Sequence, residues 1–258
     1  MKTQVEISNH SDVGKVRTVN EDYFAFYTGK FGNVLIVSDG MGGYKGGFVA
    51  SHLAVEAVKN HFATLDNNIV PREELRKALQ NANNDIKTKA LEDIELKNMG
   101  ATAVVLLRIR EEVFIAHIGD SRIYMVRGDK IHQLTKDHSL VQQMVDGGLI
   151  TAEAARNHPN RNIITQVLGS GSNNTPFIEK ESISIFRGDY FVLCSDGLTG
   201  YLEDEEIKTI VLSHPGQEAC RLMVDIANKR GGKDNITVQI LEVKKGKRIP
   251  VNLNSPMS

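Results

Sequence analysis

The chain has 258 residues, of which 41% are hydrophobic and 24% charged, so one folded domain or two small ones are expected. Its formal net charge of -1 argues against a broad electrostatic grip on nucleic acid or on an anionic membrane surface. No apolar run approaches the ~20 residues that span a bilayer, and the N-terminus lacks the apolar core of a signal peptide.

Six apolar stretches rich in β-branched and aromatic residues predict β-strands, at residues 34–37, 102–107, 113–116, 123–126, 190–194 and 237–241. The last stretch alternates apolar and polar residues, which predicts a strand with one face exposed to water. The connections at 108–112 and 127–130 are short enough for hairpins, so antiparallel sheets are expected. Cys194 lies inside an apolar stretch, and Cys220 is the only other cysteine. This cysteine usage argues against a disulfide framework and predicts a reducing, cytoplasmic location.

Three helices are predicted from apolar residues at helical spacing. One covers residues 46–63, Pro71 opens the second, and the third covers residues 216–229. The order of elements lacks a regular strand–helix alternation, which favours antiparallel sheets covered by helices over a doubly wound sheet. Residues 137–175 are polar and poor in helix, as in an active-site flap, and from Lys244 a solvated tail is predicted.

Two of the predicted strands run into the same short motif. LIVSDGMGG at residues 35–43 and VLCSDGLTG at 192–200 both place Ser-Asp-Gly directly after an apolar run. A single Ser-Asp-Gly is most simply a turn. Two matched copies, together with acidic segments at 20–22, 119–122 and 234–237, indicate that several strand ends bring carboxylates into one cleft.

Carboxylates gathered in one cleft repel each other, and a multivalent cation relieves that repulsion. Oxygen ligands without cysteine or histidine suit Mg²⁺ or Mn²⁺ rather than Zn²⁺. Two such ions can activate a water molecule for in-line attack on phosphorus. The pattern therefore predicts metal-dependent phosphoryl chemistry.

Five segments in order resemble the motifs of the PP2C (PPM) protein Ser/Thr phosphatases, in their bacterial form. They are RTVNED at 17–22, DGMGG at 39–43, GDSR at 119–122, SDG at 195–197 and DNIT at 234–237, and the stretch LTKDHSLVQQMVDGGLIT is also similar. The resemblance covers roughly residues 6–243. It implies an α+β fold, a four-layer αββα sandwich with two antiparallel sheets inside. One phosphatase domain would span residues 1–243, with 244–258 as its tail.

The resemblance implies that Asp39, Asp196 and Asp234 are the catalytic metal ligands. Asp39 would bridge two Mn²⁺ or Mg²⁺ ions, and Asp196 and Asp234 would complete the first site. Glu21 and the carbonyl oxygen of Gly40 would serve the second site. A water bridging both ions would then attack phosphoserine or phosphothreonine on proteins.

Four further residues receive roles from the resemblance. Asp22 would orient bound water, and Asp120 would hold a weaker third cation together with Asp196. Arg17 would clamp the substrate phosphate, which suits its planar fork of donors, although a surface salt bridge is the simpler alternative. Asn235 would either orient a ligand or cap a turn.

Met41 departs from the animal members of the family, which carry a histidine at this place, proposed to protonate the leaving group. Met41 cannot donate a proton, so the sequence does not identify the general acid. His158 in the predicted flap would either contact substrate or stand in solvent.

Other functions are weighed against this one. The glycine-rich GMGGYKGG lacks the Gly-Lys-Ser/Thr ending of a nucleotide loop, and neither Asp-Gly carries the second aspartate of an aspartyl-phosphate phosphatase. A catalytically inactive phosphatase fold that serves as a regulatory module is the main alternative, but every expected acidic position is filled. By resemblance, the expected partners are phosphorylated proteins and a eukaryotic-like Ser/Thr kinase, with no nucleic acid or membrane, and the chain is expected to be a monomer.

Overall fold

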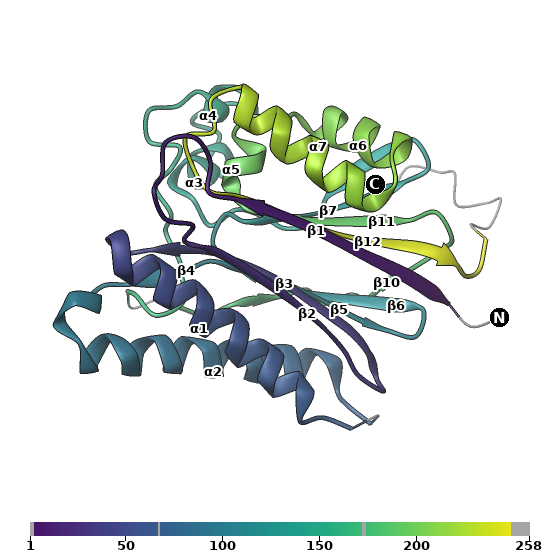
Figure 1. The fold of residues 1–258 in the computed structure, drawn as a ribbon, viewed down its shortest axis with the longest axis horizontal. Coiled ribbons are helices and arrows are strands. Elements are labelled where there is room, and N and C mark those ends of the chain that lie inside the picture. The colour runs from purple at the N-terminus through teal and green to yellow at the C-terminus, as the bar shows by residue number, and fades with distance from the viewer. Residues whose placement is uncertain (1–2, 67, 172–173, 249–258) are drawn as a thin grey trace.

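Two antiparallel β-sheets face each other in the computed structural model, and helices cover the outer face of each (Figure 1). The structure describes residues 3–66, 68–171 and 174–248. In the view of Figure 1, α1 (Gly43–Ala63) and α2 (Pro71–Glu92) lie below the sheets, and α6 (Asp204–Ser213) and α7 (Gly216–Lys229) lie above them. The predicted α+β fold, a four-layer αββα sandwich, is confirmed.

The upper sheet has five strands, in the order β1 (Gln4–Asp12), β12 (Ile236–Lys245), β11 (Tyr190–Cys194), β7 (Arg122–Arg127) and β8 (Lys130–Gln133). The path of the lower sheet is β10 (Ile183–Ser184), β6 (Glu112–Ile118), β5 (Ala103–Ile109), β3 (Gly32–Met41) and β2 (Asp22–Thr28). Two short strands lie off this path: β4 (Gly100–Ala101) pairs with β3, and β9 (Phe177–Ile178) pairs with β6. Each of the six predicted strands coincides with an observed one.

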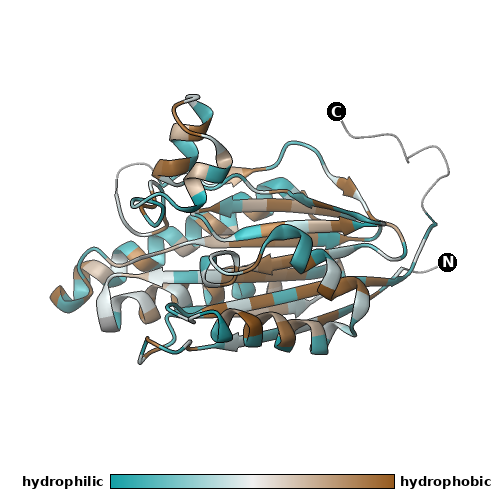
Figure 2. Ribbon diagram, turned by 90° about the horizontal axis from the view of Figure 1, so that it is seen from above, coloured by the Kyte–Doolittle hydropathy of each residue, from teal (hydrophilic) through white to brown (hydrophobic). Residues whose placement is uncertain are grey.

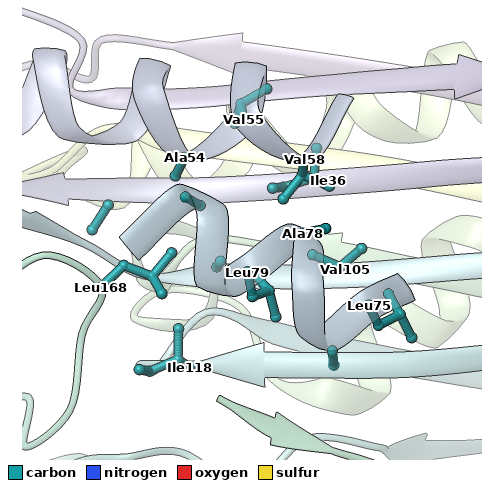
Figure 3. Packing of buried hydrophobic residues seen from close by; sticks show 14 of the residues in the cluster. Ile36, Ala54, Val55, Val58, Leu75, Ala78, Leu79, Val105, Ile118 and Leu168 are labelled. Carbon is teal, nitrogen blue, oxygen red and sulfur yellow. The ribbon is translucent and has the colours of Figure 1, made fainter. Parts of the chain in front are cut away.

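The lower helices seal the outer face of the lower sheet. The apolar residues at helical spacing in α2 are fully buried: Leu75, Leu79, Ala82 and Ile86. Val58 of α1 lies beside Ile36 of β3, and Leu79 of α2 lies near Val105 of β5 (Figure 3). Hydrophobic and hydrophilic positions alternate along the helices, as one-sided packing requires (Figure 2). Each fully buried leucine contributes roughly 1.5–3 kcal/mol relative to an exposed one.

The space between the two sheets is filled by a second set of apolar side chains. Leu35 and Val37 of β3 face Leu193 and Leu241 of the upper sheet in this core. Strand β3 is therefore buried on both faces, which explains its continuous apolar run. The predicted water-exposed face of residues 237–241 is wrong, because Thr237 and Gln239 of β12 are both fully buried in this sandwich.

The predicted flap, residues 137–175, contains two short helices that the sequence analysis did not predict. They are α3 (Leu140–Asp146) and α4 (Ala152–Arg156), whose first turns are capped by the hydroxyls of Ser139 and Thr151. The remaining helices are the 3₁₀ turn η1 (Ile94–Leu96) and α5 (Asp196–Thr199). Strand β12 runs to Lys245, two residues into the segment predicted as a tail, and residues 249–258 lie outside the described ranges.

We expect Gln239→Met to stabilise the chain by about 1 kcal/mol, because an unpaired buried acceptor would be removed. Gln239 is fully buried, its Oε1 has no hydrogen-bond partner in the described part of the chain, and its Nε2 donates to the Ala25 carbonyl over a long 3.4 Å. Thr237→Val is the matched control on the same face of β12, since the Thr237 hydroxyl pairs with Ser11 Oγ at 2.7 Å and should cost stability when lost. Urea denaturation measures both, and a less stable Gln239→Met variant would contradict the prediction.

Candidate active site

Five aspartates meet at one end of the sandwich because each stands where a strand begins or ends (left in Figure 1). Asp22 opens β2 and pairs across the ladder with Asp39 near the end of β3. Asp120 follows β6, Asp196 follows β11, and Asp234 precedes β12. The two copies of Ser-Asp-Gly thus belong to different sheets, and the sandwich brings their carboxylates together.

The pKa values of these aspartates reflect how close together the carboxylates lie. Burial, and then repulsion from Asp22, Asp196, Asp120 and Asp234, raises the pKa of Asp39 well above its usual range. Burial and neighbouring carboxylates likewise raise the pKa of Asp120 and Asp196, and the pKa of Asp22 rises to about 7. A cluster that resists full ionisation in this way is a functional-site candidate.

Several buried carboxylate oxygens at this end of the sandwich have no hydrogen-bond partner among the residues that the structure describes. They are Oε1 of Glu21 and Oδ1 of Asp22, Asp120 and Asp196. Unpaired carboxylate oxygens are costly to bury, and hard divalent cations take oxygen ligands. The donor set therefore fits Mg²⁺ or Mn²⁺.

Within the described part of the chain, no three His, Cys, Asp or Glu side chains already surround a point that could hold a metal ion. Mg²⁺ usually keeps several water molecules among its ligands, so the protein need not supply a complete set. A backbone carbonyl such as that of Gly40 would add one more oxygen ligand.

The glycines that follow Asp39 and Asp196 permit close backbone contact. A Cβ on Gly40 would meet the Gly47 carbonyl oxygen at 2.0 Å, and one on Gly197 would meet the Asn235 carbonyl oxygen at 1.9 Å. Gly47 is equally confined, since its Cβ would lie 2.4 Å from Glu21 Oε1. Helix α1 can therefore approach Gly40 and Glu21, and β12 can approach Asp196. From the sequence, Gly47 stood out only as the last residue of the glycine-rich GMGGYKGG, and no role was predicted for it.

A hydroxyl network that the sequence analysis missed fixes Asp39 and Asp22. The Asp39 N–H donates to Thr102 Oγ1 at 2.9 Å, and the Thr102 N–H donates to the Asp39 carbonyl at 2.8 Å. Ser195 Oγ donates to Asp22 Oδ2 at 2.7 Å and accepts the Thr237 N–H at 3.0 Å. The observed contact of Asp22 is thus a link between β2 and the upper sheet, and the only sequence signal for it was Ser195 in the repeated motif.

The loop before β2 is anchored by Asn235. Its Nδ2 donates to the carbonyls of Val13 (2.9 Å) and Val19 (3.0 Å), and its Oδ1 accepts the Glu21 N–H (2.8 Å). Asn235 is buried, so it positions Glu21 through the backbone rather than capping an exposed turn. Arg17, on the same loop, is exposed and donates to Asp234 Oδ2 at 2.9 Å.

A cavity of about 410 Å³ opens beside Asp120 and Asp196, and its opposite wall comes from the predicted flap, including Arg156 and Arg161. His158 is not among the residues that line it, and its Nδ1 accepts the Asn160 N–H within its own loop. Met41 stands exposed at the end of β3.

The profile of the family described as Protein phosphatase 2C matches residues 14–237 of this chain. The chain belongs to the protein phosphatase 2C family. The family resemblance read from the five motifs is therefore confirmed.

Similar proteins cover almost the whole chain. Protein phosphatase PhpP of Streptococcus pneumoniae is 39% identical over 245 residues, which are 93% of this chain and 98% of PhpP. The solved serine/threonine phosphatase of S. agalactiae has a TM-score of 0.87 at 34% identity and covers 93% of this chain and 100% of its own. The catalytic domain of the phosphatase PstP, solved in complex with two manganese ions, has a TM-score of 0.84 at 31% identity over 95% and 100% of the two chains.

None of the helices in the described ranges has the length and apolar character needed to cross a membrane.

We expect Asp39→Asn to raise the melting temperature of the chelator-treated protein, because one of the repelling carboxylates is removed. A rise of at least about 2 °C corresponds to ~1 kcal/mol in a chain of this size. Added Mn²⁺ should raise the melting temperature of the unsubstituted chain and do so far less in the variant. Asp225→Asn, an exposed substitution on α7, is the matched control and should change neither value. Equal Mn²⁺ shifts in all three proteins would contradict a metal role for Asp39.

Proposed function

We propose that this chain is a metal-dependent protein phosphatase that hydrolyses phosphoserine and phosphothreonine. The observation that carries the proposal is the meeting of five aspartates, from five separate motifs, at one end of the sandwich. The names of PhpP and of the S. agalactiae enzyme support the reaction, and the manganese complex of PstP supports the cation. No feature of the site favours the alternative of an inactive regulatory module.

In this proposal Asp39, Asp196 and Asp234 would hold the first cation, and Asp39, Glu21 and the Gly40 carbonyl would hold the second. Two divalent cations, when bound, would supply Lewis acidity and activate water for in-line attack on phosphorus. Thr102 holds the backbone of Asp39 and Asn235 that of Glu21, so both carboxylates stand on fixed supports.

The outer residues complete the proposed site. Asp120 and Asp196 border the open cavity, where we place a weaker third cation. Arg17 would exchange its partner Asp234 for the substrate phosphate, since its position on the exposed loop leaves the guanidinium accessible. Met41 offers no proton and His158 bonds within its own loop, so we assign protonation of the leaving oxygen to water.

The partners in this proposal are phosphorylated proteins, among them a eukaryotic-like Ser/Thr kinase and its targets. Pure electrostatic attraction does not select them, because the site itself is acidic and the chain has no overall positive charge. Selection would therefore rest on the cavity wall contributed by residues 137–175.

We expect phosphate release from a phosphothreonine peptide in Mn²⁺, its loss after chelation and dialysis, and its return with Mn²⁺ or Mg²⁺. Asp39→Asn should reduce the rate to background while circular dichroism shows an intact fold, and Asp225→Asn should retain full activity. Undiminished turnover after exhaustive chelation would contradict the metal-dependent mechanism. A folded, manganese-binding protein with no turnover on any phosphopeptide would instead favour the regulatory module.

We expect Arg17→Met to raise KM for the phosphopeptide about 10- to 100-fold with a smaller change in kcat, since one charge-assisted contact to phosphate is worth ~1.5–3 kcal/mol. The shift of the melting temperature on adding Mn²⁺ should be preserved, because Arg17 carries no ligand atom for a cation. Steady-state kinetics and thermal melts measure the two effects. If the Mn²⁺ shift disappears while KM stays constant, Arg17 supports the metal site and not the substrate.

A further inference from the structure

A second cavity, of about 860 Å³, lies at the end of the sandwich away from the aspartates. Its walls come from the β2–β3 turn (28–33), the β5–β6 turn (108–112) and residues 184–186, with Thr3 and Lys247 from the upper sheet's end. Strand β3 begins at this cavity with Gly32 and reaches Asp39 only near its other end. In Figure 1 this is the right-hand end, beside the N-terminus.

Arg108 stands in the wall of this cavity without an acidic partner. Its Nη1 donates to Asn33 Oδ1 at 3.0 Å and its Nη2 to the Thr3 carbonyl at 3.2 Å, while its Nε is buried and unpaired. Arg108 makes no ion pair among the described residues, and the residues outside those ranges include no Asp or Glu. Burial alone lowers the pKa of this guanidinium, because removing a charge from water costs free energy. A bound anion would offset that cost.

The other charged residues of the cavity also leave an excess of positive charge. Lys30 and Arg110 are exposed at its two turns and make no ion pair within the described ranges. Glu111 is paired with Lys247 at 2.6 Å, and Glu112 accepts the hydroxyl hydrogen of Ser182. The lining therefore carries four cations, Lys30, Arg108, Arg110 and Lys247, against the two carboxylates of Glu111 and Glu112, which leaves an excess of two positive charges.

The cavity also has an apolar floor. Phe31, Ile185 and Phe186 line it and are buried. A volume of this size, with an apolar floor and a few convergent polar groups, is typical of small-molecule sites. A guanidinium with two or more free donors suits bidentate binding of phosphate or carboxylate.

We propose that this cavity binds a small molecule that carries at least two negative charges, as phosphate or carboxylate groups, with Arg108 as its principal contact. Lys30 and Arg110 attract the ligand at the mouth, and the buried aromatic rings contact its apolar part. The site lies away from the aspartates and does not depend on the proposed phosphatase reaction.

The test uses the full chain after chelation, because the cation-free aspartate site repels anions and leaves the second cavity as the anion site. Calorimetric titration with pyrophosphate and, separately, with citrate should show binding of one molecule per chain to at least one of them. Arg108→Met should weaken that binding about 10-fold or more, since it removes the charge and keeps most of the stem. Arg76→Met is the matched control, an exposed arginine on α2 that should leave the affinity unchanged.

Binding of pyrophosphate alone would identify a phosphate-bearing ligand, binding of citrate alone a carboxylate-bearing one, and either supports the proposal. If circular dichroism shows that Arg108→Met is unfolded, the double variant Lys30→Gln/Arg110→Gln, at exposed turn positions, decides by the same criterion. The proposal is overturned if neither anion binds, or if Arg76→Met weakens binding as much as Arg108→Met. Loss of binding in Arg17→Met would place the anion at the aspartate site and would also overturn it.

Discussion

Repulsion among carboxylates at one end of the sandwich is the constraint on which the rest of the structure depends. Asp22 and Asp39 are cross-strand partners, and Asp196 approaches them from the opposite sheet. Such an arrangement persists only if the surrounding structure holds it, because burial and repulsion from the neighbouring carboxylates raise the pKa of Asp39 well above its usual range. The apolar core between the sheets supplies that support: Leu35, Val37 and Leu193 fasten the two strands whose ends carry the acids.

The close packing around the aspartates follows from the same constraint. Gly40 and Gly197 let neighbouring backbone lie where any side chain would collide, and Thr102 and Ser195 satisfy backbone groups beside the acids. Within the described ranges, four buried carboxylate oxygens of the site have no hydrogen-bond partner: Oε1 of Glu21 and Oδ1 of Asp22, Asp120 and Asp196. The surrounding backbone groups have hydrogen-bond partners, whereas these carboxylate oxygens do not. Such a site is organised to bind a ligand through the carboxylate oxygens.

The sequence predicted the elements whose signal is local. Residues 190–194 and 216–229 were placed with their observed ends, because an apolar run and a helical stripe each specify one element. The edge strands β1 and β2 were missed. The second half of β1, Ser8 to Asp12, is polar and resembles a loop. The aromatic-rich DYFAFYT of β2 does carry a strand signal, which the sequence analysis overlooked. The exposed face expected for β12 was wrong for a related reason: Thr237 and Gln239 are polar, but their burial is decided by the opposite sheet. The acidic positions were readable from repeated motifs, whereas the contacts of Thr102 with Asp39 and of Arg17 with Asp234 join segments that only the fold brings together.

A net charge near zero conceals two opposite ends. Aspartates gather where β3 ends, and Arg108, Arg110 and Lys30 gather where it begins. Asp39 lies seven residues beyond Gly32 in β3, so the two groups are about 23 Å apart. This separation is several Debye lengths at physiological salt, ~8 Å each, so each group acts on ligands as if the other were absent. The net charge of the chain argues against a partner bound over a wide charged surface, such as nucleic acid. It gives no information about the charge at either end of the sandwich. Each end must therefore be interpreted from the unpaired atoms found there.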